Sequence, residues 1–304
     1  MHIKRAAIIG FGAIGCVYGR HLYDYLGDDF AVIAGGKRGE RLKRDGAVIN
    51  GYKMMPKVIA PEETDWKADL IIIAVKNYAL DSAVEDMKNI MTPETLILPV
   101  FNGIAGRERL TEAFPKNTVF YGLCRTDALR NADGSILCTW EGAIEFGHAE
   151  NRESAEDVRA VKELFDAAGI ESTVCEDMQR AVWLKFMRNV SMNQLAAVTG
   201  LSYGALRSIP EMSESVKEIL TEVVNVARGL GIDLRYEDVD DCYKIMAASS
   251  ADAKPSTLQD VEAKRPLETD IFAGSVIEEG KKAGVPTPWN NVLYKLLKIK
   301  EAAY

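Results

Sequence analysis

The sequence predicts an α/β domain with a parallel sheet in its first half and an all-helical domain in its second half. Short apolar runs alternate with amphipathic stretches up to about residue 176, which is the pattern of strand–helix–strand units. Beyond that residue the recognisable elements have helical spacing, and none reads as a strand. A length of 304 residues also favours two domains. We therefore predict domains at residues 1–176 and 177–304.

The apolar runs of the first half are short, as expected of strands that are buried on both faces. They are Ala6–Ile9, Ala31–Ile33, Leu70–Val75 and Leu96–Val100. Helical spacing is seen in Ala13–Leu26, Arg38–Asp45, Leu80–Ile90 and Ala155–Ala168, and Ser172–Val174 reads as a last strand. Two strand-like stretches flank a turn at Asn131–Gly134, so we predict a hairpin that extends the sheet in the antiparallel direction.

Four helical stretches make up the second half. They are Met178–Val198, Met212–Gly229, Asp238–Ala248 and Pro266–Ala283. Gly284 and Pro286 follow the last of these and are typical of a helix end.

Composition excludes several classes of function. The net charge of −8 argues against binding to a nucleic-acid backbone. The five cysteines form no C-x-x-C pair and the three histidines lie far apart, so we expect neither a disulfide framework nor a metal site. The longest clean apolar run is Leu70–Val75, far shorter than a membrane helix. We expect a cytoplasmic protein without a membrane partner, and the sequence leaves a homodimer open.

A glycine-rich turn directly follows the first predicted strand and opens a helix. It consists of Gly10, Phe11, Gly12, Ala13, Ile14 and Gly15, a G-x-G-x-x-G pattern. In a Rossmann turn the first glycine permits the bend, the second lets a pyrophosphate approach, and the third lets helix and strand pack closely. The helix N-terminus offers free N–H groups to the phosphates. We predict a dinucleotide site here, and the alternative is a turn that needs glycine for its shape alone.

The end of the second strand bears on the choice between NAD and NADP. An NAD site places a carboxylate about 20 residues after the turn. Here Lys37 and Arg38 follow a glycine pair, and the first carboxylate is Glu40. Two cations in that place favour the 2′-phosphate of NADP(H), unless they are ordinary solvated charges at a helix start.

Three polar residues recur at helical spacing near the start of the second half. Lys185, Asn189 and Asn193 stand at i, i+4 and i+8, which places an ammonium and two amides on one helical face. Because asparagine is unfavourable inside helices, the pattern suggests a polar site for a substrate carbonyl, and an exposed polar stripe is the alternative that the pattern by itself leaves equally open. A lysine there is suited to act as a general acid.

Other polar residues stand where ligands bind in α/β folds or near helix starts. Lys76 and Asn102 follow predicted strands of the parallel sheet, whose carboxyl ends are the usual ligand site. Ser256 and Glu268 stand near helix starts. By themselves they are an N-cap and a first-turn carboxylate.

Taken together, these residues resemble the ketopantoate reductase family, nearly from end to end. The matching pieces are G-F-G-A-I-G at 10–15, A-V-K at 74–76, N-G at 102–103, K-x-x-x-N-x-x-x-N at 185–193, and Ser256 with Glu268 twelve residues later. The resemblance implies a Rossmann-type dinucleotide-binding domain and a helical catalytic domain. It also implies NADPH-dependent reduction of 2-dehydropantoate to pantoate, on the route to pantothenate and coenzyme A.

The resemblance also implies a role for each matching residue. Lys185 is similar to the family's catalytic general acid, and Glu268 to the carboxylate that orients it. Asn102, Asn189, Asn193 and Ser256 resemble substrate-binding groups. The glycine turn with Lys37, Arg38, Lys76 and Asn102 resembles the cofactor site, although Gly35 stands where many relatives have an arginine.

Two alternatives remain open at this stage. One is a related NAD(P)-dependent reductase of another small 2-keto acid. The other is an NADP-binding sensor without turnover, which would have no need for both Lys185 and Glu268.

Overall fold

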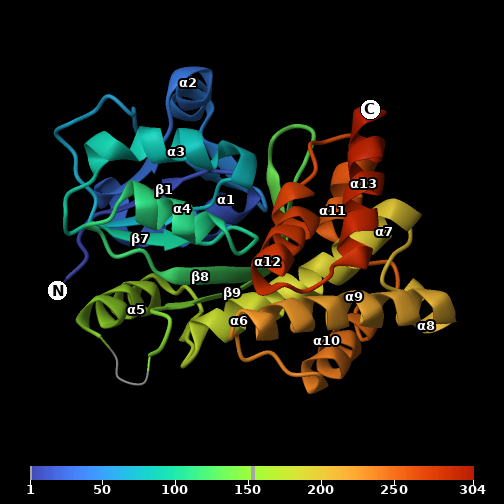
Figure 1. Ribbon diagram of the computed structural model, residues 1–304. Coiled ribbons are helices and arrows are strands. Elements are labelled where there is room, and N and C mark those ends of the chain that lie inside the picture. The colour runs from blue at the N-terminus through green and yellow to red at the C-terminus, as the bar shows by residue number, and fades with distance from the viewer. Residues whose placement is uncertain (1, 152–154) are drawn as a thin grey trace. The chain divides into compact units, whose positions relative to one another are not determined.

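The computed structural model describes residues 2–151 and 155–304, and its chain divides into two compact units (Figure 1). Unit 1 runs to Asn102 and continues over Gly106–Met178, while unit 2 contains Gly103–Ala105 and Gln179–Tyr304. The α/β class of the first part and the helical class of the second are confirmed. None of the helices in the described part of the chain is long and apolar enough to span a bilayer.

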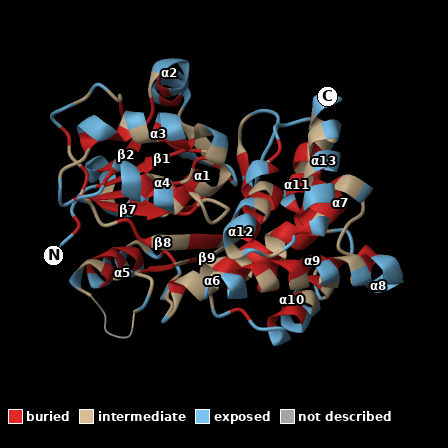
Figure 2. Cartoon of the chain, in the orientation of Figure 1, coloured by how far each residue is buried: buried red, intermediate tan, exposed pale blue. Residues whose placement is uncertain are grey.

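Unit 1 is built on a five-stranded parallel sheet of order β5-β2-β1-β6-β7. Its strands are β1 (Ala6–Ile9), β2 (Phe30–Ile33), β5 (Lys57–Ile59), β6 (Leu70–Ile73) and β7 (Leu96–Pro99). Strands β1, β2, β6 and β7 are fully buried, because side chains of both faces pack into apolar cores (Figure 2). The predicted apolar runs therefore became strands with nearly the expected bounds.

Helices cover both faces of this sheet. One face packs on α1 (Ala13–Leu26), α5 (Glu156–Ala168) and the second sheet. The other packs on α3 (Leu80–Met87) and α4 (Gly106–Ala113). The remaining helical elements of unit 1 are α2 (Gly36–Asp45) and the 3₁₀ turns η1 (Gly27–Asp29), η2 (Asn77–Ala79) and η3 (Lys88–Ile90).

The predicted hairpin is present, but it belongs to a separate sheet and does not extend the first one. Its strands are β8 (Tyr121–Arg130) and β9 (Ile136–Gly147), with the expected turn between them. Strand β9 also pairs with β10 (Ser172–Val174) and β3 (Ala47–Ile49), and β3 pairs with β4 (Tyr52–Met54). The prediction was wrong because β3 and β4 are three-residue strands, too short to reveal this second sheet from their sequence.

Unit 2 is helical and has its own apolar core. Its helices are α6 (Met178–Arg188), α7 (Gln194–Thr199), α8 (Ala205–Ser208), α9 (Pro210–Gly229), α10 (Glu237–Ala247), α11 (Ser256–Glu262), α12 (Ser275–Ala283) and α13 (Pro288–Ala302). Two short π-helical turns lie in the predicted helices at 178–198 and 266–283. The turn η4 (Asn189–Asn193) joins α6 to α7, whereas η5 (Asp270–Gly274) begins the helix that α12 continues. The helical class of both stretches is confirmed, but the predicted start of the second at Pro266 was wrong, since residues 266–269 are not helical.

Candidate functional site

The glycine turn has the tight geometry that the sequence predicts. Gly10 has φ +96°, and a Cβ built on it would lie 2.5 Å from the backbone carbon of Ala74, just after β6. A Cβ on Gly15 would lie 2.2 Å from the carbonyl oxygen of Gly10. Glycine is thus required at both positions, first for the bend and its contact with β6, then for the packing of α1 on the turn.

Gly12 differs from its two neighbours in the motif. No described atom outside its immediate surroundings lies within 4 Å of a Cβ built there, so folding alone does not require glycine. It is the N-cap of α1 and no side chain caps that helix end, which leaves N–H groups for an anion. Open space at a helix N-terminus fits a nucleotide pyrophosphate.

The other residues of the motif contribute in a different way. The Phe11 ring packs against Phe30, with ring centroids 6.4 Å apart, and is buried in the core. Ala13 and Ile14 also pack against that core. Their backbone, and not their side chains, is therefore what a nucleotide would contact.

Lys76 and Asn102 lie beyond the carboxyl ends of β6 and β7, as predicted. Strand β6 is the immediate neighbour of β1, and β7 is the next strand along. Lys76 and Asn102 are half-buried and follow the ends of their strands by three residues. The glycine turn, Lys76 and Asn102 therefore share one edge of the sheet, where ligands bind in this topology.

Lys37 and Arg38 both lie in the first turn of α2. The structure places a further cation, Arg130, near Arg38, which the sequence did not indicate. Arg130 is the last residue of β8. The hairpin follows α1, since Tyr18 Oη lies 2.6 Å from Thr126 Oγ1, and Ala128 packs in the same core as Ala13. Arg130 continues this path towards the N-terminus of α1.

Electrostatics agree that Arg38 and Arg130 are close. Desolvation lowers the pKa of the Arg38 guanidinium, and the charge of Arg130 lowers it further. Burial raises the pKa of the nearby Cys16 thiol to about 12, and Arg130 and Arg38 partly oppose this rise. Within residues 2–151 and 155–304 neither arginine has a carboxylate partner. Two unpaired cations beside a glycine turn suit an anionic ligand.

Lys185 lies on helix α6, which is well anchored within unit 2. Arg180 makes a bidentate ion pair with Asp238 of α10, with N–O distances of 2.7 and 2.9 Å. Trp183 and Phe186 pack their rings edge to face in the core, while Lys185 between them is half-buried. The backbone that carries Lys185 is therefore held in place, while the residue itself stays partly exposed.

The two asparagines of the motif are the first and last residues of the π-helical turn η4. Of the two, Asn193 is buried. A π-turn has i→i+5 hydrogen bonds and a wider circumference than an α-turn, so Asn189 and Asn193 lie on a widened turn and not on the regular α-helix that their spacing predicts. Such turns occur frequently at functional sites.

Ser256 is brought to this turn from a distant part of the chain. Asn193 Nδ2 donates to Ser256 Oγ at 3.3 Å, although 63 residues separate them. Ser256 is the first residue of α11, with Pro255 as the N-cap, so its hydroxyl is not an N-cap as the simpler interpretation had it. Two of the predicted substrate groups thus meet directly.

Glu268 precedes the second π-turn. Its carbonyl oxygen accepts from the N–H groups of Ile271 and Phe272, each at 3.2 Å, so its backbone begins η5. The side chain belongs to a half-buried residue. The turns η4 and η5 pack against each other within unit 2, which places Glu268 near the element that carries Asn189 and Asn193.

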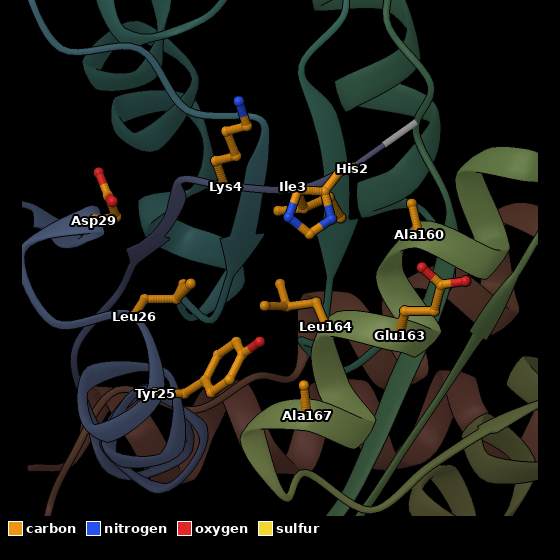
Figure 3. Close-up of a pocket in the computed structure, with 10 residues that line it drawn as sticks. All are labelled: His2, Ile3, Lys4, Tyr25, Leu26, Asp29, Ala160, Glu163, Leu164 and Ala167. Atoms are coloured by element: carbon orange, nitrogen blue, oxygen red, sulfur yellow. The ribbon is translucent and has the colours of Figure 1, made fainter.

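A cavity of about 600 Å³ in unit 1 contains none of these residues (Figure 3). It lies where the chain enters β1, at the opposite end of that strand from the glycine turn. Its lining includes His2, Lys4, Tyr25, Asp29 and Glu163. No sequence motif pointed to it, and it lies apart from the predicted nucleotide edge.

Comparison with known proteins places this combination of elements in one family. Residues 6–151 match the family model "Ketopantoate reductase PanE/ApbA", and residues 177–301 match the model of its C-terminal part. The chain belongs to the ketopantoate reductase family. The resemblance inferred from the ordered motifs is thereby confirmed.

Relatives of the ketopantoate reductase family align over nearly the whole chain. A 2-dehydropantoate 2-reductase of Streptococcus pyogenes is 26% identical over 97% of this chain and 97% of its own length. The Bacillus subtilis protein named "Uncharacterized oxidoreductase YkpB" is 27% identical over 97% of this chain and 98% of its own.

Solved structures agree in fold. The 2-dehydropantoate 2-reductase of Methylococcus capsulatus has a TM-score of 0.86 at 27% identity, covering 98% of this chain and 97% of its own. A D-mandelate dehydrogenase solved with NADH has a TM-score of 0.87 at 23% identity, covering 98% and 99%. Family and fold indicate an NAD(P)-dependent oxidoreductase acting on 2-keto acids.

Proposed function

We propose that this protein reduces 2-dehydropantoate to pantoate with NADPH, a step towards pantothenate and coenzyme A. The contact of Asn193 with Ser256 is the observation that carries the proposal. It joins two motifs of the ketopantoate reductase resemblance, one of which also contains Lys185. A sensor without turnover gives no reason for this polar pair on a motif that also carries a lysine.

Each residue of unit 2 has a task in the proposed reaction. Lys185 polarises the C2 carbonyl of the keto acid and donates a proton to the oxygen as its negative charge develops. Asn189, Asn193 and Ser256 bind the polar groups of the substrate and fix its orientation. Glu268 orients the substrate and the lysine near the new hydroxyl. NADPH, when bound, supplies the hydride that reaches C2.

Unit 1 holds the nucleotide in this proposal. Backbone N–H groups of the glycine turn and of α1 bind the pyrophosphate. Lys76 and Asn102 lie at the strand ends, on the side of the nicotinamide ribose. Lys37, Arg38 and Arg130 bind the 2′-phosphate, since they supply positive charge near α1 and α2 without a carboxylate that would suit a free ribose.

Replacing Arg130 by alanine is expected to weaken NADPH binding about 10-fold or more and to leave NADH binding within about 2-fold. A hydrogen bond to a charged group contributes roughly 1.5–3 kcal/mol, and only NADPH carries the 2′-phosphate. Fluorescence titration of each nucleotide measures both dissociation constants. Arg44→Ala is the matched control, because it removes the same charge from the far end of α2. Equal losses for both nucleotides would remove the 2′-phosphate role of Arg130.

The substrate is tested by a panel of branched and aromatic 2-keto acids, each with NADPH and with NADH. We expect the highest kcat/KM for 2-dehydropantoate with NADPH. The reaction is measured by the loss of absorbance at the dihydronicotinamide band. A preference for an aromatic keto acid would support the alternative of a related reductase, which the likeness in fold to a D-mandelate dehydrogenase favours. Nucleotide binding without turnover of any acid would support the sensor.

The quaternary state and location complete the proposal. We propose a homodimer in the cytoplasm. Sedimentation of the purified protein measures the mass of the particle, and a mass of one chain would contradict the dimer.

A further inference from the structure

The two π-turns of unit 2 need partners outside their own helices. In a regular α-helix, the N–H of Ala273 would donate to the carbonyl of Thr269. That carbonyl instead accepts from Gly274, at 3.1 Å. At the end of the other π-turn, η4, the N–H of Gln194 donates to the carbonyl of Ser191. In a regular α-helix it would donate to the carbonyl of Val190. The N–H of Ala273 in η5 and the carbonyl of Val190 in η4 therefore do not have their usual helical partners.

A single buried side chain bonds to both of these groups. Gln194 is fully buried. Its Oε1 accepts from Ala273 N at 3.0 Å, and its Nε2 donates to Val190 O at 2.9 Å. Because each half of the amide serves one π-turn, the two turns are bridged through this residue.

The orientation of the Gln194 amide is itself determined by a buried network. The Glu222 carboxylate, which only accepts when ionised, accepts from Asn290 Nδ2 at 2.7 Å. The Oδ1 atom of Asn290 therefore faces Gln194 and accepts from its Nε2 at 3.1 Å. Glu222 also accepts from the backbone N–H groups of Trp289 and Asn290, in the first turn of α13. This chain of donors and acceptors directs Oε1 of Gln194 at Ala273.

We infer that Gln194 is a positioning residue that fixes both π-turns and thereby sets Asn189, Asn193 and Glu268 for the keto acid. The inference rests on the proposed function, because it assigns that reaction to residues on and beside these turns. Asn189 and Asn193 lie on η4, and the carbonyl of Glu268 begins η5. Removing one partner from this buried network destabilises it, because the remaining polar groups stay buried without their hydrogen bonds.

The test compares Gln194→Met with Val239→Ala. Methionine keeps the length of the side chain and removes all three hydrogen bonds, whereas Val239 is a buried core residue of α10 outside the network. For Gln194→Met we expect kcat/KM for the keto acid to fall about 10–100-fold, since a misplacement of 1 Å can cost about 100-fold. The dissociation constant of the nucleotide should stay within about 2-fold. Val239→Ala should lower Tm and leave kcat/KM unchanged.

Gln194→Glu supplies a conservative rescue. A protonated carboxyl has one donor and one acceptor and can serve both turns, whereas the ionised form only accepts. Glu222 is the ionisable neighbour in the network. We expect kcat/KM of Gln194→Glu, relative to wild type, to rise as pH falls from about 8 to about 6. A purely structural role predicts a flat ratio and Gln194→Met kinetics equal to wild type, either of which would overturn the inference.

Hydrogen exchange separates this inference from the proposed function. If wild-type protein reduces none of the keto acids, the proposed function fails. Exchange of peptides covering 189–193 and 270–274 then decides the role of Gln194 alone. We expect faster exchange in both peptides for Gln194→Met and in neither for Val239→Ala. Unchanged exchange in Gln194→Met would show that Gln194 does not hold the turns.

Discussion

Replacing Lys185 by methionine is expected to lower kcat by about 10²–10⁴-fold, the range in which a positioned general acid contributes. Methionine retains the apolar stem of the side chain and removes the ammonium that polarises the carbonyl and delivers the proton. Because Lys185 lies on α6, an element anchored by Trp183, Phe186 and the Arg180–Asp238 ion pair, the fold should survive. Steady-state kinetics with saturating nucleotide and circular dichroism measure the two effects.

Lys244→Met is the control for loss of charge in unit 2. Lys244 is an exposed lysine of α10 that pairs with Asp241, and exposed pairs of this kind contribute little. Its kcat should equal that of wild type. Wild-type kcat in Lys185→Met would show that another group delivers the proton.

Replacing Gly15 by alanine is expected to destabilise unit 1 by about 1–3 kcal/mol or more, the usual cost of overpacking. The new methyl group would approach the carbonyl oxygen of Gly10 to 2.2 Å, and that atom is backbone and cannot rotate away. The turn and α1 must therefore separate. Thermal unfolding without nucleotide measures the loss, and an unchanged Tm would contradict the close packing described for this turn.

Gly12→Ala should behave in the opposite way. Its φ of −93° suits alanine and a Cβ there meets open space. The loss of glycine at an N-cap is offset in part by a smaller unfolded-state entropy, so stability should change by no more than about 1 kcal/mol. We expect NADPH affinity to fall at least about 10-fold, because the methyl group occupies the space proposed for the pyrophosphate. Undiminished affinity in calorimetric titration would place the nucleotide elsewhere.

Local signals in the sequence predicted much of the fold. Ala6–Ile9 and Ala13–Leu26 were given their observed bounds, because a buried parallel strand and an amphipathic helix each have a pattern within a few residues. The second sheet had no such signal. Its strand β9 pairs with partners from both ends of unit 1, and pairings between distant segments depend on the packing of the whole unit.

The candidate site shows the same division. The glycine turn, Lys76 and Asn102 were predictable, since their place after buried strands determines the edge that they share. Arg130 was not, because only the packing of the hairpin along α1 brings it near Arg38. The spacing of Asn189 and Asn193 was noticed, but the π-turn depends on Gln194 and on partners about 80 and 96 residues away. No local pattern in the sequence indicates those contacts.

We propose that this chain transfers a hydride from NADPH to a small 2-keto acid, with 2-dehydropantoate as the substrate. The most direct measurement uses NADPH that carries deuterium at the transferable C4 position, followed by mass spectrometry of the acid product. We predict pantoate with one deuterium at C2 from wild type, and little product from Lys185→Met under the same conditions. Intact NADPH binding with no deuterated hydroxy acid from 2-dehydropantoate would contradict the claim.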